Sequence, residues 1–154
     1  MTTLVPPPQS SAYALVNDLC ESATLASVHR AAPDEWAREE LLLAKLGPRG
    51  WGRVHHFRNY YASGWGEHTG KVLSPKALSA FFRFVHAFDF PNGVIPSVFL
   101  TDQGGIELCW EEEKSKSVQV EFTRVGAEFY RESTGEEDTV SHAALAQLVQ
   151  RLSS

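Results

Sequence analysis

The sequence of 154 residues carries 43% hydrophobic side chains and a formal net charge of −5. This length and composition fit one globular domain with its own core, and the acidic balance argues against non-specific nucleic-acid binding by the protein as a whole. No apolar run approaches the ~20 residues of a membrane helix and no signal peptide is recognisable, so we expect a cytoplasmic protein that does not contact membranes.

The N-terminal third is predicted to be a tail followed by two helices. Residues 1–9 contain three consecutive prolines, which favour an extended, flexible tail, and residues 10–154 then form the single domain. Apolar residues at helical spacing predict a first helix over 10–27. A second helix is predicted to begin at Pro33, because proline suits the first helical position, and to end at Gly47, which can cap it.

The middle of the chain is predicted to be a loop followed by a third helix. Residues 47–72 contain six glycines, which are too many for a long helix, and a short extended run is predicted over 54–61. Ser74 is a suitable N-cap and Pro75 a suitable first-turn residue, so a helix is predicted from there to Phe88.

The C-terminal part is predicted to be an antiparallel meander and a final helix. From residue 98, apolar side chains recur at every second position, which is typical of half-buried strands. We predict three or four strands joined by turns at 102–105, 113–117 and 125–126, with the acids 136–138 in a loop and Ser141 capping the last helix. The predicted fold class is α+β: N-terminal helices, a glycine- and aromatic-rich loop, a helix, the meander and a C-terminal helix.

Part of the sequence resembles a group of small, uncharacterised bacterial proteins. In that group a Trp-Asp-Gly-type loop precedes a helix, and a meander then opens with Thr-x-Asp-Gly-Gly and continues as Leu-x-Trp. The resemblance covers about residues 64–130, and it is carried by Gly64, Trp65, Gly66, Glu67, Leu73, Ser74, Pro75, Ala77, Leu78, Pro96, Thr101, Asp102, Gly104, Gly105, Ile106, Leu108 and Trp110. Gly66 and Glu67 depart from the pattern, because the group tends to have Asp and then Gly there. The resemblance implies this order of elements and a bacterial or phage origin, and it brings no activity.

Positive charge is concentrated in the middle of the chain. Residues 45–88 hold seven Lys and Arg against one acid, Glu67, together with nine of the seventeen aromatic residues. Such a segment can bind an anionic partner, or it can neutralise phosphates while its aromatics stack on unpaired bases, unless these side chains are used within the fold. The candidate residues of this basic aromatic loop are Arg49, Trp51, Arg53, Arg58, Tyr60, Tyr61, Trp65 and Lys71.

Negative charge is expected on one face of the meander. Glu107 and Glu111 share a strand face, and Glu121 joins them if its apolar neighbours point to the core. The simplest reading is a solvated sheet face. The alternative is that this acidic face binds a basic partner protein, since a field of one sign raises association rates and selects partners.

Residues suited to catalysis do not form a recognisable motif. His55, His56 and His68 with Glu67 are the nearest approach to a metal or acid–base site, but adjacent histidines on a strand point to opposite faces. Cys20 and Cys109 lie too far apart for a metal or redox pair, and Cys109 is expected to be an unreactive thiol. We therefore predict no metal site, no catalytic residues and no cofactor.

The function predicted from the sequence is that of a non-catalytic interaction protein of bacterial or phage accessory type, antitoxin-like or anti-defence-like. It would bind a protein partner through the acidic face, the basic aromatic loop or both. Two alternatives remain open: nucleic-acid binding through residues 49–71, and a small metal-dependent or histidine-dependent enzyme. The sequence leaves the oligomeric state open.

Overall fold

The computed structural model describes residues 33–154, with side chains from residue 39 onward. The predicted tail over 1–9 and the predicted helix over 10–27 lie outside the described residues. The described chain contains three α-helices and one five-stranded antiparallel sheet, which confirms the predicted α+β class. No helix within residues 33–154 has the length and apolar character needed to cross a membrane.

Helix α2 (Pro33–Tyr60) consists of two helical segments that meet at Gly47. Gly47 has φ 68° and ψ 169°, a backbone conformation that is essentially restricted to glycine, so the predicted break at this residue is confirmed. Pro48 follows immediately and begins the second segment, where its missing N–H has no consequence.

The predicted loop and extended run over 47–61 are wrong, because the chain stays helical to Tyr60. Val54 and Phe57 are buried at helical spacing, and Gly50 lets the helix approach Val98 and the Pro96 carbonyl. Glycine within a helix costs only ~0.5–1 kcal/mol relative to alanine, which is less than the burial of two such side chains contributes. Tertiary packing therefore outweighs the glycine content of this segment.

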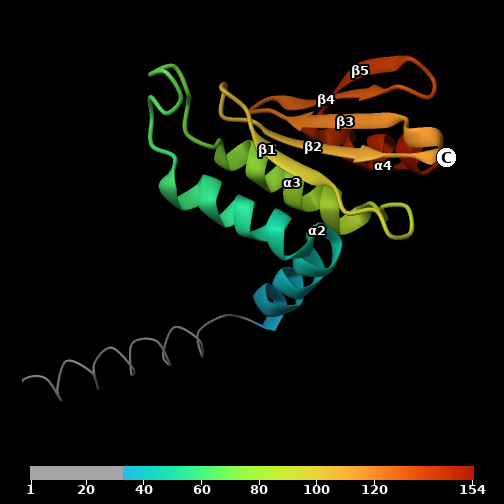
Figure 1. Cartoon of the computed structure of the whole chain (residues 1–154), viewed down its shortest axis with the longest axis horizontal. Helices are drawn as coiled ribbons and strands as arrows, with labels where there is room; N and C mark the ends of the chain where they lie inside the picture. The colour runs from blue at the N-terminus through green and yellow to red at the C-terminus, as the bar shows by residue number, and fades with distance from the viewer. Residues whose placement is uncertain (1–32) are drawn as a thin grey trace, which may run out of the picture. The chain divides into compact units, whose positions relative to one another are not determined.

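Helix α3 (Pro75–Ala87) confirms the third predicted helix. The Ser74 hydroxyl accepts a hydrogen bond from the Ala77 amide, and Pro75 occupies the first turn. Its core face buries Ala77, Ala80, Phe81, Phe84 and Val85. Figure 1 shows α2 running beside α3, and the rings of Trp51 and Phe82 join the two helices with centroids 6.3 Å apart.

The sheet is a simple meander with strand order β1-β2-β3-β4-β5. The strands are β1 (Ser97–Leu100), β2 (Ile106–Glu111), β3 (Ser117–Phe122), β4 (Gly126–Arg131) and β5 (Glu136–Ser141). The turns between β1 and β4 lie within two residues of their predicted positions, and Ser117 and Gly126, which were predicted to be turn residues, begin β3 and β4. The fifth strand was not predicted, because only Val140 of β5 is buried and the strand therefore lacks an apolar pattern. The acids at 136–138 belong to this strand, so their predicted place in a loop is wrong.

The last helix begins later than predicted. Residues His142–Ala144 form a short 3-10 turn and α4 (Leu145–Ser153) follows it, while the Ser141 side chain makes no capping hydrogen bond. Helix α3 packs against β2, β3 and β4, and α4 packs against α3 and β5. Both helices therefore cover the same face of the sheet, where the core lies, as Figure 1 shows.

Candidate functional site

Within residues 39–154 no helix packs against the face of the sheet turned away from α3 and α4, although the Arg53 guanidinium of α2 reaches Phe99 at its β1 edge. Side chains alternate between faces along a strand, and the buried hydrophobic side chains of the strands all belong to the core face. We call the opposite side the open face. Its side chains are Ser97, Phe99, Glu107, Cys109, Glu111, Ser117, Gln119, Glu121, Glu128, Tyr130, Glu137, Thr139 and Ser141.

Three glutamates lie in register on adjacent strands of the open face. Glu107 of β2 is directly opposite Glu121 of β3, and Glu121 is directly opposite Glu128 of β4. We call these three residues the glutamate row. The structure thus brings together two of the three predicted acids, whereas Glu111 lies opposite Ser117 at the end of the strand. Glu128 was missed, although its position between the core residues Ala127 and Phe129 could have placed it on this face.

No strand side chain of the open face is Lys or Arg, although the Arg53 guanidinium of α2 lies 5.2 Å from the ring centroid of Phe99, the cross-strand neighbour of Glu107. Side chains directly opposite on antiparallel strands have Cβ atoms about 5 Å apart, and like charges there are destabilising by ~0.2–1 kcal/mol for each pair. None of the ion pairs found within residues 39–154 involves the row. The row therefore opposes folding slightly and leaves its negative charge available to solvent or to a partner.

Cys109 lies beside the row and is held as a neutral thiol. Its Sγ donates a hydrogen bond to Glu107 Oε1 over 2.8 Å. Burial, this hydrogen bond and the charge of Glu107 together raise the pKa of Cys109 to about 12. A thiol with this pKa is a poor nucleophile at neutral pH, so the residue contributes polarity to the face and not reactivity.

Aromatic side chains lie on both sides of the row. Phe99 of β1 pairs with Glu107 in the register and is 42% exposed, and Tyr130 of β4 is 38% exposed in the next cross-strand row. Exposed aromatics are typical contact residues at interfaces because they bury large areas with few rotatable bonds. The open face thus combines an acidic centre with apolar surface on either side.

The residues of the predicted basic aromatic loop are divided between surface and fold. Arg49, Arg58 and Tyr60 are exposed on α2, but Arg58 lies on the opposite flank of the helix from Arg49. Arg53 Nη1 donates to the Val98 carbonyl over 3.0 Å, and its guanidinium lies 5.2 Å from the Phe99 ring centroid. Arg53 therefore holds the second segment of α2 on the edge strand β1.

The remaining members of that set support local structure. Tyr61 packs edge-on against Trp65 with ring centroids 5.0 Å apart, and Trp65 Nε1 donates to the Lys71 carbonyl over 2.7 Å. Lys71 Nζ donates to Gln103 Oε1, which ties this loop to the turn between β1 and β2. Trp51 is half-buried against Phe82. The eight residues therefore do not form one continuous cationic surface.

The histidines of the enzyme alternative do not converge. His55 contacts Trp51, and His56 stacks on Tyr60 with ring centroids 5.0 Å apart. Glu67 and His68 are exposed at the tip of a turn, where both adopt left-handed backbone conformations. Within residues 39–154 no group of three or more His, Cys, Asp and Glu is arranged to hold a metal ion.

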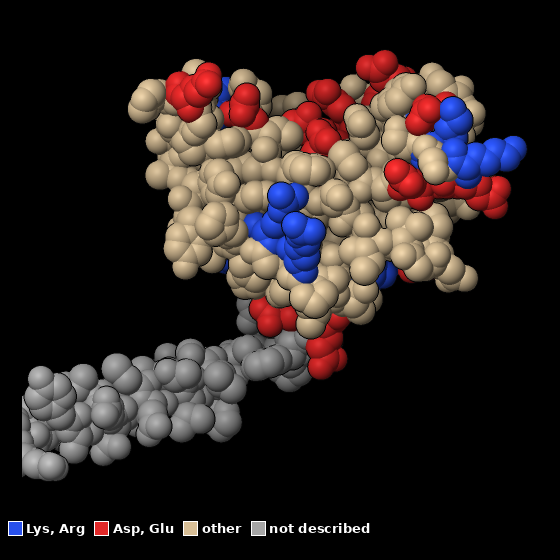
Figure 2. Space-filling view, in the orientation of Figure 1, with Lys and Arg blue, Asp and Glu red and all other residues tan. Residues whose placement is uncertain are grey.

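Acidic and basic side chains are partly separated on the surface. In the orientation of Figure 2, acidic side chains lie along the upper side of the molecule and a compact basic cluster lies below them, whereas acids and bases lie next to one another at the right and further acids lie at the lower end. The basic cluster and the acids above it therefore produce local fields of opposite sign, which a charged partner can distinguish.

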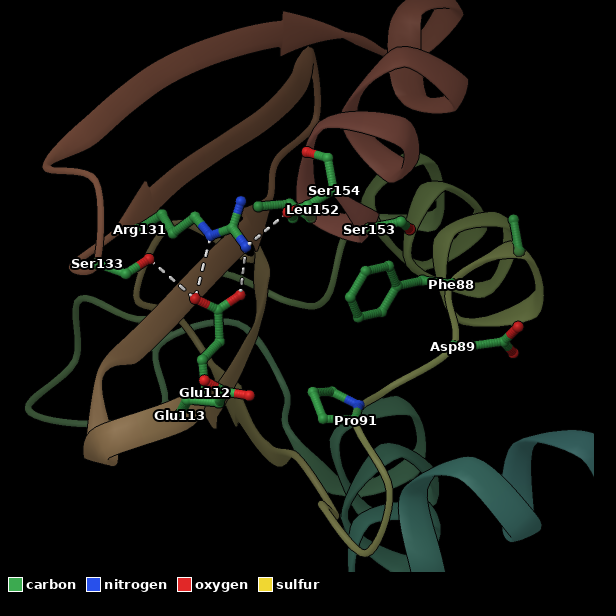
Figure 3. Close-up of a pocket in the computed structure, with 11 residues that line it drawn as sticks. Phe88, Asp89, Pro91, Glu112, Glu113, Arg131, Ser133, Leu152, Ser153 and Ser154 are labelled. Atoms are coloured by element: carbon green, nitrogen blue, oxygen red, sulfur yellow. Dashed lines mark hydrogen bonds and ion pairs between the residues drawn. The ribbon is translucent and has the colours of Figure 1, made fainter.

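A cavity of about 690 Å³ lies between the end of α3 and the end of α4. Figure 3 shows Phe88 and Pro91 on one side of it and the ion pair of Arg131 with Glu112 on the other. Arg131 Nη2 lies 2.9 Å from Glu112 Oε1 and also donates to the Ser154 carbonyl, while Nε donates to Glu112 Oε2 and Nη1 to the Arg151 carbonyl. These polar groups already satisfy one another, so the cavity wall is a structural clamp on α4.

No protein-family profile matches the chain, and no curated protein and no solved structure was found to match it. The resemblance of residues 64–130 to small bacterial proteins therefore stays a prediction from the sequence.

Proposed function

We propose that this protein is a non-catalytic interaction module whose open sheet face binds a basic segment of a protein partner. The observation that carries the proposal is the glutamate row, which places three carboxylates opposite one another, none of them in an ion pair with another described residue. Folding alone favours oppositely charged or apolar pairs at such positions. A partner that brings Lys or Arg against the row removes the repulsion and gains the attraction, so binding uses an arrangement that folding disfavours.

The surroundings of the row suit a protein partner. Phe99 and Tyr130 offer exposed aromatic area on either side of the carboxylates. Acidic charge accelerates the encounter with a basic partner, and aromatic contacts slow its dissociation. The thiol of Cys109 is protonated at neutral pH, and the histidines lie apart, which supports binding over catalysis. The resemblance to small bacterial proteins adds an accessory role, antitoxin-like or anti-defence-like, to the proposal, and the sequence adds a cytoplasmic location.

The test is a titration of a fluorescently labelled, lysine- and arginine-rich peptide by fluorescence anisotropy. Three proteins are compared: the wild type, the row-reversed variant Glu107→Lys/Glu121→Lys, and the variant Glu67→Lys/Glu113→Lys, which has the same net charge but leaves the row intact. We expect the peptide to bind the row-reversed variant at least about tenfold more weakly than the matched control. Equal affinities for these two variants would refute the proposal.

A second candidate function is nucleic-acid binding by α2. Arg49, Arg53, His56 and Tyr60 recur at helical spacing on one exposed side of the second segment. This stripe can contact phosphates through its arginines and stack a base on Tyr60. A labelled single-stranded oligonucleotide should then bind with an affinity that falls steeply with salt and is lost in Arg49→Glu/Arg53→Glu, while the row-reversed variant binds it at least as well as the wild type.

A further inference from the structure

The two edges of the sheet differ in how far they are occupied. Edge strand β1 has four residues, and its outward Val98 carbonyl accepts the hydrogen bond from Arg53 of α2. Edge strand β5 has six residues, and no other strand or helix of the described chain hydrogen-bonds to its outer side. An exposed edge of this length is a ready template for another strand. The β5 edge is therefore the available one.

The hydrogen bonds of β4 identify which groups of β5 point outward. The amide of Thr123 donates to the Gly126 carbonyl, and the amide of Glu132 donates to the Ser117 carbonyl, so even-numbered residues of β4 pair with β3. Odd-numbered residues of β4 then pair with β5, because hydrogen-bonding direction alternates along an antiparallel strand. In the observed register these partners are Glu136, Asp138 and Val140.

Glu137, Thr139 and Ser141 consequently direct their backbone N–H and C=O groups away from the sheet. One of these donors, the Thr139 amide, is bound by Asp138 Oδ1 over 2.8 Å. Within residues 33–154 no hydrogen-bond partner is found for the amides of Glu137 and Ser141. The β5 edge thus presents two free donors, the amides of Glu137 and Ser141. Between them, the Asp138 carboxylate occupies the Thr139 amide.

From this arrangement we infer that the basic segment of the partner adds to β5 as a sixth strand of the sheet. The inference rests on the proposed function and gives its binding mode. Charge selects the occupant: Glu136, Glu137 and Asp138 make the edge acidic, so pairing with the β5 of a second copy would set acids against acids. Arg151 of α4 neutralises Glu136 and Asp138 on the core side, whereas Glu137 has no basic neighbour on the open face.

The added strand also connects the edge to the glutamate row. On the open face its side chains lie opposite Glu137 and Thr139, and Glu128 is the residue next to Thr139 in the register. Strands are about 4.8 Å apart, so the backbone of Glu128 is roughly 10 Å from the added strand. A lysine or arginine side chain of the added strand and the Glu128 side chain can together span this distance. The fitting partner therefore has basic residues at alternate positions, one for Glu137 and one that reaches over Thr139 to Glu128, the member of the row nearest to this edge.

The test is amide hydrogen exchange, followed by NMR, on the full-length protein with and without a peptide of alternating lysine and threonine. We expect exchange at the Glu137 and Ser141 amides to slow at least about tenfold when the peptide is bound, while Glu136 and Val140 are already protected without it. Glu137→Pro, which removes an outward donor, should weaken peptide binding more than Glu137→Gln, which removes the same charge but keeps the donor.

Other outcomes separate this inference from the proposed function. If the peptide binds the wild type but not the row-reversed variant, and the Glu137 and Ser141 amides exchange as before, strand addition is refuted while the proposed function stands. If the peptide binds neither protein, or binds both equally well, the proposed function fails. Protection of the same amides that grows with protein concentration and needs no peptide would show that a second copy occupies the edge, which would also overturn the inference.

Discussion

Removing the central charge of the glutamate row should stabilise the protein. Glu121 faces Glu107 on one side and Glu128 on the other, so Glu121→Gln eliminates two like-charged cross-strand pairs. At ~0.2–1 kcal/mol for each pair, the free energy of unfolding should rise by about 1 kcal/mol. For a domain of this size, that gain raises the melting temperature by about 4 °C.

Urea denaturation followed by circular dichroism measures this change, and the chain offers two internal controls. Glu128→Gln removes one like-charged pair and should give about half the gain in the free energy of unfolding. Glu111 lies opposite Ser117, so Glu111→Gln should change the free energy of unfolding by less than about 0.5 kcal/mol. The gain should shrink in 1 M salt, where the Debye length is only about 3 Å. A gain that is absent at low salt, or as large for Glu111→Gln as for Glu121→Gln, would refute the reasoning that the row is repulsive.

Three further predictions concern the rest of the fold. Lys116 and Ser117 lower the pKa of the Glu132 carboxyl group from 4.5 to about 2. The resulting contribution to the free energy of unfolding is complete above pH 4.5 and is lost as the pH falls toward 2. In acid denaturation, the stability difference between the wild type and Glu132→Gln should therefore vanish over that interval. In urea denaturation, Gly47→Ala should lower the free energy of unfolding by ~1–3 kcal/mol, because residue 47 has a left-handed backbone conformation. Gly52→Ala should raise it by ~0.5–1 kcal/mol, because position 52 is helical and has open space around it. Equal effects would contradict the kink at Gly47. In thermal unfolding, Arg53→Ala should lower the free energy of unfolding by about 1 kcal/mol, because it removes the contacts with Val98 and Phe99. Arg49 is exposed, so Arg49→Ala should leave thermal stability nearly unchanged. The reverse order would show that Arg53 does not hold α2 on the β1 edge.

Local signals in the sequence predict α3 and the first four strands correctly. Ser74 and Pro75 mark the beginning of α3, and the alternating apolar residues of β2 and β3 match the core face residue by residue. These elements have one fully buried side, so their hydrophobic pattern states their geometry directly.

The failures occur where tertiary contacts outweigh local preference. The second segment of α2 contains Gly50 and Gly52, yet Val54 and Phe57 fix it as a helix against the core. Strand β5 is mostly charged and polar, and it forms because β4 supplies its hydrogen bonds and Arg151 neutralises its acids. Neither partner is visible to a local reading of the sequence.

The candidate site was predicted in part. Alternation places Glu107 and Glu121 on one face, but only the strand register shows that they are directly opposite and that Glu128 continues the row. The expected cationic loop is divided because Arg53, Trp65 and Lys71 bind groups within the fold. The charges in the sequence therefore indicated both the acidic face and the basic segment. Only the contacts among the described residues show that the glutamate row makes no ion pair with them, whereas part of the basic segment is used within the fold.

The most direct measurement of the central claim is affinity capture from lysate of the native host, with and without nuclease treatment. Three tagged proteins are compared: wild type, Glu107→Lys/Glu121→Lys, and the charge-matched Glu67→Lys/Glu113→Lys. The glutamate row is expected to retain a stoichiometric basic protein in the wild type and in the matched control and to lose it in the row-reversed variant. Retention of the same partner by all three proteins, or its loss on nuclease treatment alone, would contradict the claim that the open face binds a protein.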